Sequence, residues 1–233
     1  SRNVAIDSPA NFAEALAFDT LDAELRWTRD AGRTEVRMER LAFASPQATG
    51  SARGTWRSLP QGPGEIDLTA SIPRTDVRDL HRYLPRWLQA STRDWVRLGL
   101  VQGSGEDARL VLKGDLAHFP FTDGKRGQFL VTVKARGVSL DYAEGWPRLD
   151  QADADVRFEG PGLHVDLQRA RIMGAQVGRT RGDIPDLNAE YRAQLIGPLE
   201  VAVGAVLVIA VVGLAVSRIL LALSSVAAVF VII

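Results

Sequence analysis

Cysteine is absent from this chain of 233 residues, and histidine and lysine occur only three times each. The absence of cysteine excludes a disulfide scaffold, a zinc–thiolate site and a cysteine nucleophile. Arginine and lysine together number 28, as do aspartate and glutamate, so the formal net charge is zero. A chain without excess positive charge lacks the broad basic field that binds nucleic acid, and we expect no nucleic-acid partner.

The motifs of common catalytic sites are also missing. Neither the Gly-x-Ser-x-Gly turn of serine hydrolases nor the Gly-x-x-x-x-Gly-Lys phosphate loop occurs. His81, His118 and His164 lie on different expected elements, without the spacing of metal ligands. We therefore expect a protein that is not an enzyme and has no cofactor. An envelope hydrolase is the rival hypothesis, and it requires a polar cleft around His118 and Asp123.

Asp150, Asp153 and Asp155 form an acidic set that invites a calcium interpretation, because Ca²⁺ prefers several oxygen ligands. The set lacks the glycine and the distal glutamate of a calcium-binding loop. Asp153 and Asp155 also fall on the polar side of an alternating run. We interpret the set as part of a solvated strand face.

Aromatic residues make up only 7% of the chain. The tryptophans lie far apart on different expected elements, namely Trp27, Trp56, Trp87, Trp95 and Trp146. Spread in this way, they do not form a stacking platform for bases, and we interpret them as packing anchors.

What the sequence does contain is a repeated alternation of apolar and polar residues with a period of two. The alternation is clearest at residues 66–72, 128–136, 155–159 and 163–168. One apolar and one wetted face per strand is typical of antiparallel strands that are buried on one side. The runs are separated by glycine-containing turns at residues 61–64, 123–127 and 160–162. The pattern predicts strands of 5–9 residues, which are about 17–30 Å long.

Two stretches depart from this period. Between Thr75 and Leu98 the apolar residues recur at nearly 3.6, which predicts two short helices at about residues 76–84 and 91–99. From Val201 to Ile233 only six of 33 residues fall outside the hydrophobic set, and Arg218 is the one charged residue. This run exceeds the ~20 residues that cross a bilayer core, and it predicts a C-terminal membrane helix.

These patterns predict a mainly β protein in which a curved antiparallel sheet forms an open groove. Two short helices are too little material to cover the apolar face of such a sheet, and an uncovered apolar face marks a binding surface. We divide the chain into an N-terminal β segment, a short helical insertion, a second β segment of the same groove and a transmembrane helix, at residues 1–74, 75–105, 106–199 and 200–233.

The middle of the chain resembles a known family. An ordered series of Gly, Pro and Trp landmarks carries the resemblance: Arg82-Tyr83-Leu84-Pro85, Arg93-Asp94-Trp95, Leu112-Lys113-Gly114-Asp115-Leu116, Phe119-Pro120-Phe121, Gly127-Gln128-Phe129, Leu140-Asp141-Tyr142-Ala143, Gly145-Trp146-Pro147, Ala154-Asp155-Val156-Arg157-Phe158 and Ile184-Pro185-Asp186-Leu187. In this order and spacing they are similar to the YhdP family of AsmA-like bacterial envelope proteins, over roughly residues 12–190.

The resemblance implies a large protein of the bacterial inner membrane that lies mostly in the periplasm. It also implies a bridge-like lipid carrier, whose antiparallel strands curl into a groove for phospholipid acyl chains. No catalytic residues accompany that role. The family's membrane helix is expected at the N-terminus of a much longer chain, whereas the hydrophobic run here lies at the C-terminus, where we expect it to bind the membrane.

The apolar positions of the alternating runs are the residues that we expect to line the groove: Leu110, Leu112, Phe129, Val131, Val133, Val156, Phe158, Leu163, Val165 and Leu167. The alternative is that the same residues form the closed core of a β-sandwich, as in a structural or adaptor module of the cell envelope. The two hypotheses differ in whether the apolar face is covered.

The orientation of the membrane helix has two conflicting indications. Arg179, Arg181 and Arg192 precede the hydrophobic run and no basic residue follows it, so the positive-inside rule puts the domain in the cytoplasm. The family resemblance implies the periplasm, and we follow the resemblance.

Overall fold

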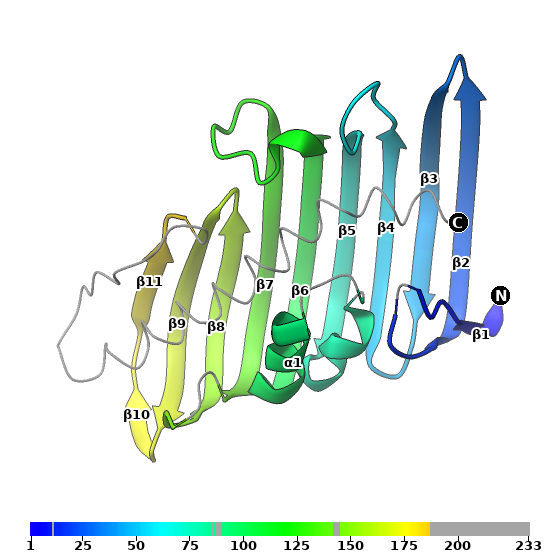
Figure 1. The fold of residues 1–233 in the computed structure, drawn as a ribbon. Coiled ribbons are helices and arrows are strands. Elements are labelled where there is room, and N and C mark those ends of the chain that lie inside the picture. The colour runs from blue at the N-terminus through cyan, green and yellow to red at the C-terminus, as the bar shows by residue number, and fades with distance from the viewer. Residues whose placement is uncertain (11, 85, 87–89, 142–144, 187–233) are drawn as a thin grey trace.

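The structure, a computed structural model, describes residues 1–10, 12–84, 86, 90–141 and 145–186. Within these residues eleven strands form one antiparallel sheet (Figure 1). The elements follow one another as β1 (Arg2–Ile6), β2 (Leu16–Asp30), β3 (Arg33–Ala44), β4 (Ala48–Arg57), β5 (Glu65–Asp76), η1 (Val77–Tyr83), α1 (Ala90–Gly99), β6 (Leu100–Asp115), η2 (Leu116–His118), β7 (Gly127–Leu140), β8 (Leu149–Glu159), β9 (Gly162–Ile172), β10 (Ala175–Val177) and β11 (Thr180–Ile184).

The strand order is the order of the chain from β1 to β10, and β11 also pairs with β9. β10 pairs with the end of β9, at residues 170–172, and β11 pairs with its beginning, at residues 163–167. The sheet is open, with β1 at one edge and β10 and β11 at the other. The described residues therefore do not form the closed β-sandwich core that the adaptor alternative assumed.

The strands are longer than the alternation predicted. Those from β2 to β9 have 10–16 residues instead of 5–9. The prediction was wrong because β-bulges interrupt the strands, for example between Met38 and Leu41 and between Ala135 and Val138. A bulge inserts one extra residue, so the period of two is broken in the sequence while the strand continues in space.

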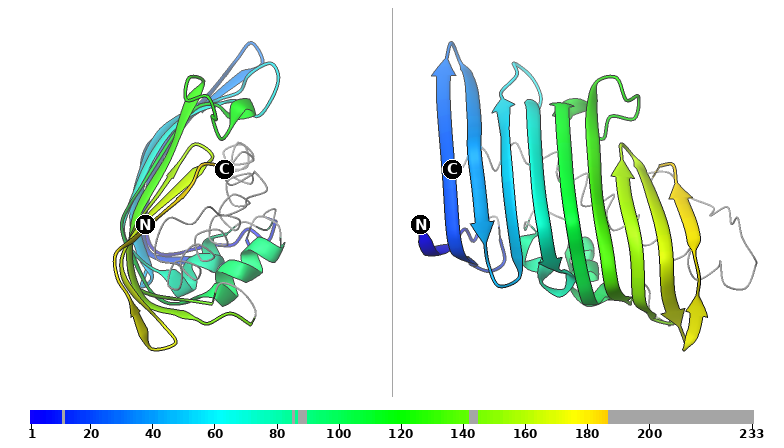
Figure 2. Two further views of the ribbon diagram at one scale, coloured as in Figure 1. Left: turned by 90° about the vertical axis from the view of Figure 1, so that its left-hand side faces the viewer. Right: turned by 180° about the vertical axis from the view of Figure 1, so that it is seen from behind.

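The sheet is strongly curved, and Figure 2 shows the strands bending into a C-shaped profile. Bulges favour such bending because they increase local twist and kink the strand that carries them. The helices η1 and α1 lie inside the curve at one end of the strands. The connection between β6 and β7 lies inside it at the other end. We call the inner side of the sheet the concave face and the outer side the convex face.

Both predicted helices are present within residues 75–105, and the first is a 3₁₀-helix. Asp76 caps η1, since its side chain accepts a hydrogen bond of 3.0 Å from the backbone N–H of Arg78. Val77 of η1 and Val96 of α1 are buried. The two helices cover only one end of the concave face.

The tryptophans do not all act as packing anchors. Trp56 is buried and its Nε1 donates a hydrogen bond of 3.0 Å to the carbonyl of Pro63. By contrast, Trp27 is 72% exposed and Trp146 is 45% exposed. Trp87 lies outside the described residues. The prediction was therefore correct for Trp56 and wrong for Trp27, because spacing along the chain does not show where a sheet ends.

Candidate functional site

The ten residues predicted to line a groove all lie on the concave face. Cross-strand pairing aligns them in rows, and one row runs from Leu110 through Val131 and Phe158 to Leu163. A second row pairs Leu112 with Phe129. The remaining members form the row Val133–Val156–Val165 and the neighbouring position Leu167, which pairs with Ala154. The structure thus brings the ten together on one apolar surface that extends over four strands.

These ten residues are not equally covered. Five are buried, with exposed fractions of 8% or less: Leu112, Phe129, Phe158 and Leu163 near one end of their strands, and Leu167 in the middle of β9. The other five are half-buried, namely Leu110, Val131, Val133, Val156 and Val165. Among these ten residues, the concave face is therefore covered most completely at the end that carries Leu112 and Phe129.

The connection between β6 and β7 covers one end of the concave face. Leu116 and Phe121 of this connection are buried in a cluster with Leu112, Phe129 and other residues of the sheet. The Phe119 ring packs edge-on against Phe129, with centroids 5.3 Å apart. Edge-on aromatic pairs of this kind add a favourable quadrupole interaction to the burial of apolar area.

The helices cover the other end. Val77 of η1 packs in a second buried cluster with Val138, Leu140 and other residues of β7, β8 and β9, and Trp95 of α1 packs against the same cluster. The half-buried positions lie between the two clusters, and Val156 and Val165 pack against both of them. We call this middle zone the open band, and define it as Ala70, Ile72, Leu110, Val131, Val133, Val156 and Val165.

Sequence reasoning missed the part of the concave face that β5 supplies. Ala70 pairs with Leu110, and Ile72 pairs with Ala108, so both continue the rows of the open band. Their alternation was visible in the sequence, but nothing in it showed that β5 lies beside β6 across the helical insertion. The aromatic residues Phe119 and Phe121 were also missed as part of the site, since they were noted only as landmarks of the family resemblance.

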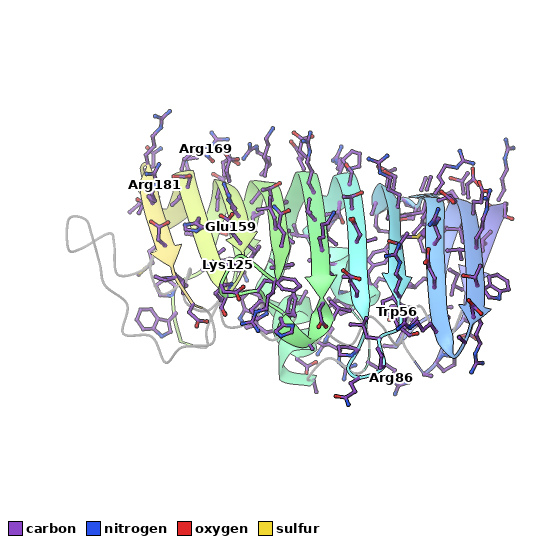
Figure 3. The ribbon with its side chains drawn as sticks, turned by 90° about the horizontal axis from the view of Figure 1, so that it is seen from above. Trp56, Arg86, Lys125, Glu159, Arg169 and Arg181 are labelled. Carbon is purple, nitrogen blue, oxygen red and sulfur yellow. The ribbon has the colours of Figure 1, made fainter. Side chains whose placement is uncertain are left out.

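The convex face carries charged residues in cross-strand ion pairs. Arg169 and Arg181 project from this face in Figure 3, and Trp56 and Arg86 lie on the opposite side. The ion pairs join neighbouring strands: Arg57–Glu35 at 3.1 Å, Lys113–Asp67 at 2.8 Å, Lys134–Asp107 at 2.6 Å, Arg136–Asp155 at 3.2 Å, Arg169–Asp153 at 2.6 Å and Arg181–Asp166 at 2.8 Å. The sheet is thus apolar inside and balanced in charge outside.

The ion pairs shift the pKa values of their members in the directions that favour the charged forms. The amino group of Lys134 hydrogen-bonds Asp107 and lowers the pKa of that carboxyl group. The carboxylate of Asp67 raises the pKa of Lys113. Exposed pairs of this type contribute little to stability, because water screens them. Their main effect is to keep the convex face soluble and to favour the observed register of the strands.

The polar groups considered for catalysis or metal binding have local structural partners. His118 lies 3.3 Å from Asp115, and Asp123 hydrogen-bonds Arg126 at 2.6 Å. Asp153 and Asp155 lie on the convex face in ion pairs with Arg169 and Arg136, which confirms the interpretation of a solvated strand face. Among the described residues, no three His, Cys, Asp or Glu side chains are grouped so that they could hold a metal ion.

The predicted membrane helix at residues 200–233 lies outside the described residues. In the part of the chain that the structure describes, no helix is both long enough and apolar enough to span a bilayer.

Comparison with known proteins gives one family and one curated relative. The chain matches the family described as YhdP protein over residues 1–208. The relative is the intermembrane phospholipid transporter YhdP of Escherichia coli (strain K12), which is 28% identical over 142 residues. The aligned region is 60% of this chain and 11% of the relative, so the chain corresponds to a small part of that protein's length. No solved structure matches the chain. Because the family match covers most of the sequence, in agreement with the landmarks noted above, the chain belongs to the YhdP family.

Proposed function

We propose that this chain is a segment of an intermembrane phospholipid transporter and that its open band carries acyl chains. The observation that carries the proposal is a continuous apolar zone, half-buried along its length and bordered by two sealed ends. The relative from Escherichia coli is named for phospholipid transport between membranes, which supports the same cargo for this chain. The chemistry required is apolar contact without catalysis.

The dimensions of the open band suit one acyl chain. It extends from β5 to β9, which are five adjacent strands in the sheet. At ~4.8 Å between neighbouring strands this distance is about 19 Å. The hydrocarbon core of a bilayer is about 30 Å thick, so each leaflet contributes a layer of about 15 Å. An acyl chain that lies across the strands is therefore in contact with the open band along its whole length.

The energetics also suit a carrier. Each methylene removed from water is stabilised by about 0.8 kcal/mol, so an acyl chain enters solution only if an apolar surface shelters it. The aliphatic side chains of the open band supply such a surface, and they offer no polar partner that would hold the acyl chain in one position. A lipid can then slide along the band without breaking specific contacts.

The proposal places most of the chain in the periplasm, with residues 200–233 in the inner membrane. A face that shelters lipid is useful in the aqueous space between two membranes, and the family resemblance implies that compartment. A reporter fused at each end of the chain tests this location: periplasmic activity of the N-terminal reporter is expected, and cytoplasmic activity would contradict it.

The test of the lipid role compares two substitutions on β7. Val133→Glu places a carboxylate on the open band, where desolvating a charge beside an acyl chain is costly. Thr132→Glu is the matched control, because Thr132 is the adjacent residue on the convex face, opposite Arg109 and Arg157. The full chain is purified in mild detergent, exchanged into buffer with phospholipid vesicles and analysed by native mass spectrometry.

We expect phospholipid to co-purify with the unmodified chain and with Thr132→Glu, and at least about tenfold less with Val133→Glu, which corresponds to ~1.4 kcal/mol. Equal amounts of co-purified phospholipid in all three proteins would contradict the assignment of the open band as the acyl-chain site. Absence of lipid from the unmodified chain, together with a partner protein captured by crosslinking, would instead favour the adaptor role.

A further inference from the structure

The convex face has a polar hollow of about 820 Å³ near the end of the strands where η1 is located. The hollow crosses β6, β7, β8, β9 and β10, which are adjacent strands in the sheet. At ~4.8 Å between neighbouring strands this distance is about 19 Å. The residues that line it are Gln102, Gly137, Gln151, Arg169, Ala170, Arg171, Gln176, Val177 and Gly178. The open band lies on the other face of the sheet, so the proposed acyl-chain site does not use this hollow.

The backbone of the sheet sets the shape of the hollow. The register of neighbouring strands shifts on β6, β7 and β8 at this level of the sheet, and such bulges bend the strands that carry them. A Cβ added at Gly137 or at Gly178 would meet no atom within 4 Å, so the space above these two glycines is open. Gln151 has a φ of +51°, a left-handed conformation that is costly for a residue with a side chain and clusters at functional sites.

Two arginines of β9 line the hollow from the convex face. Arg169 projects from this face in Figure 3, and Arg171 lies two residues further along the strand, on the same face. Asp153 orients Arg169, since its Oδ2 accepts from Arg169 Nε at 2.6 Å and its Oδ1 accepts from the N–H of Gly137 at 2.8 Å. Arg171 is exposed and forms no hydrogen bond or ion pair through its side chain within the described part of the chain, although Asp150 is its cross-strand neighbour. Its guanidinium therefore has all five N–H donors available for a ligand.

Three glutamine side chains complete the polar lining. Gln176 on β10 pairs across the strands with Arg171, so the two side chains lie on the same face. Gln102 and Gln151 come from β6 and β8. None of the three amides forms a hydrogen bond to another described residue. No aspartate or glutamate is among the described residues that line the hollow. The lining therefore combines an excess of donors with amides that, like a sugar hydroxyl, both donate and accept.

A second hollow of about 620 Å³ continues the first toward β4. The two are contiguous, because Gln102 and Gly137 line both of them. The second hollow has one carboxylate among its described lining residues, that of Asp76, which is paired with Arg78 at 2.6 Å. Its arginines are Arg74 and Arg136. An extended ligand thus meets guanidinium groups in both parts of one polar groove.

These features favour a carboxylated glycan over other extended ligands. A phospholipid is disfavoured, because the surrounding convex face carries ion pairs such as Arg136–Asp155 and Arg169–Asp153 and would not shelter acyl chains. A peptide strand is disfavoured, because β6 to β9 pair on both sides within the sheet and leave no row of free backbone partners. A glycan needs only hydrogen bonds from side chains, and its carboxylates suit the planar fork of an arginine.

We propose that the polar hollow binds a glycan that carries carboxylate groups, with a carboxylate on Arg171 and hydroxyl groups on the three glutamine amides. The inference goes beyond the proposed function and is independent of it, because the two sites lie on opposite faces of the sheet. Binding of this kind attaches the convex face to a polysaccharide while the concave face stays free for lipid.

The test is calorimetric titration of the full chain in a non-ionic detergent, at low salt so that charges are little screened. The probes are hexagalacturonate, which is a carboxylated glycan, maltohexaose, which is a neutral glycan with the same number of units, and hexaglutamate, which is an acidic peptide. The variants are Arg171→Ala, Arg171→Lys and Gln151→Gly, with Arg53→Ala as the control. Arg53 is an exposed arginine of β4 that also forms no ion pair within the described residues and lines neither hollow.

We expect hexagalacturonate to bind at least about tenfold more tightly than either other probe, which corresponds to ~1.4 kcal/mol. Arg171→Ala should weaken its binding by about tenfold. Arg171→Lys should weaken it less, because an ammonium keeps the charge without the planar fork. Gln151→Gly should weaken binding without lowering the thermal midpoint of unfolding, because glycine adopts a positive φ at no steric cost. Arg53→Ala should leave binding unchanged.

Four results would overturn the inference. Equal affinity for maltohexaose would show that the carboxylates are not recognised, and equal affinity for hexaglutamate would show that negative charge alone is bound. Unchanged affinity in both Arg171→Ala and Gln151→Gly would place the binding outside the polar hollow. Absence of hexagalacturonate binding to the unmodified chain would refute the inference directly. None of these results alters the expected co-purification of phospholipid, so the acyl-chain proposal is tested separately.

Discussion

The ring of Phe119, in the connection between β6 and β7, packs edge-on against Phe129 on β7 with their centroids 5.3 Å apart. This contact folds a loop back over the sheet that it leaves, so the loop becomes a cover for one end of the concave face. Phe121 of the same loop lies directly over two glycines, since a Cβ on Gly127 would approach its ring to 2.4 Å. The loop can therefore cover this end because its aromatic rings pack on the sheet and because Gly114 and Gly127, beneath Phe121, have no side chains.

Replacement of Phe119 tests this cover. Phe119→Ala should destabilise the chain by about 2 kcal/mol, less than a fully buried phenylalanine, because Phe119 is half-buried. The measurement is the midpoint of urea unfolding followed by circular dichroism. Lys125→Ala in the same loop is the control, and should change stability by less than about 0.5 kcal/mol since Lys125 is exposed. Equal effects of the two substitutions would show that the loop does not pack on the sheet.

Substitution of Gly54 tests the close packing of β4 against β5. A Cβ at Gly54 would lie 2.3 Å from the carbonyl oxygen of Asp67 and 2.9 Å from the Cα of Leu68, so the two strands would have to separate. Gly54→Ala should cost about 2 kcal/mol or more. Gly178→Ala is the control, because a Cβ there has no neighbour within 4 Å and its backbone is not in the left-handed region. Thermal unfolding of both variants gives the comparison, and an unchanged midpoint for Gly54→Ala would contradict the observed strand spacing.

Substitution of Asp153 tests a hydrogen bond that supports the β-bulge at Gly137. Its Oδ1 accepts from the backbone N–H of Gly137 at 2.8 Å and its Oδ2 accepts from Arg169. The Gly137 hydrogen bond is the main cause that lowers the pKa of Asp153. Asp153→Ala should therefore cost about 1 kcal/mol at neutral pH, whereas Arg169→Ala should cost less because Arg169 is exposed. Chemical denaturation of the two variants measures the difference, and a larger effect of Arg169→Ala would refute the role of the Gly137 contact.

From the contacts of Asp123 we expect a specific pH dependence of stability. Hydrogen bonds from the Arg126 side chain and from the backbone N–H groups of Lys125 and Arg126 lower the pKa of Asp123 from 3.8 to about 2. Because the folded-state pKa is lowered, the contribution of this carboxylate is complete above pH ~4 and is lost as the pH falls through 2. Carboxyl ¹³C chemical shifts measured against pH should show the low pKa. In Arg126→Gln the pKa should return toward 3.8, and an unaltered pKa would exclude Arg126 as the cause.

The sequence predicted the β architecture because burial on one face imposes alternation. Residues such as Phe129, Val131 and Val133 show the period of two directly, and they do lie on one face of the sheet. The two helical segments were predictable for the same reason, since residues 76–99 follow a period near 3.6. The bulges were not predictable, because an extra residue such as Gly137 breaks the alternation in the same way as the end of a strand.

The candidate site was only partly visible in the sequence. The apolar positions of β6 to β9 were identified, but Ile72 and Ala70 of β5 were not, because the helical insertion separates β5 from β6 along the chain. A cavity of about 310 Å³ beside η1 was not visible in the sequence at all. Its residues Val4, Phe18 and Arg82 are distant in the sequence and meet only because β1, β2 and η1 pack at one end of the sheet.

The sequence by itself thus determined the class of fold, the identity of the apolar face and the family, because each depends on local periodicity or on the order of landmarks. The tertiary structure alone decided that the sheet stays open, that its ends are sealed and that its middle is less covered. These properties depend on which strands become edges, where bulges bend the sheet and where the connecting segments fold back. Such features arise from contacts between distant residues, and no local pattern encodes them.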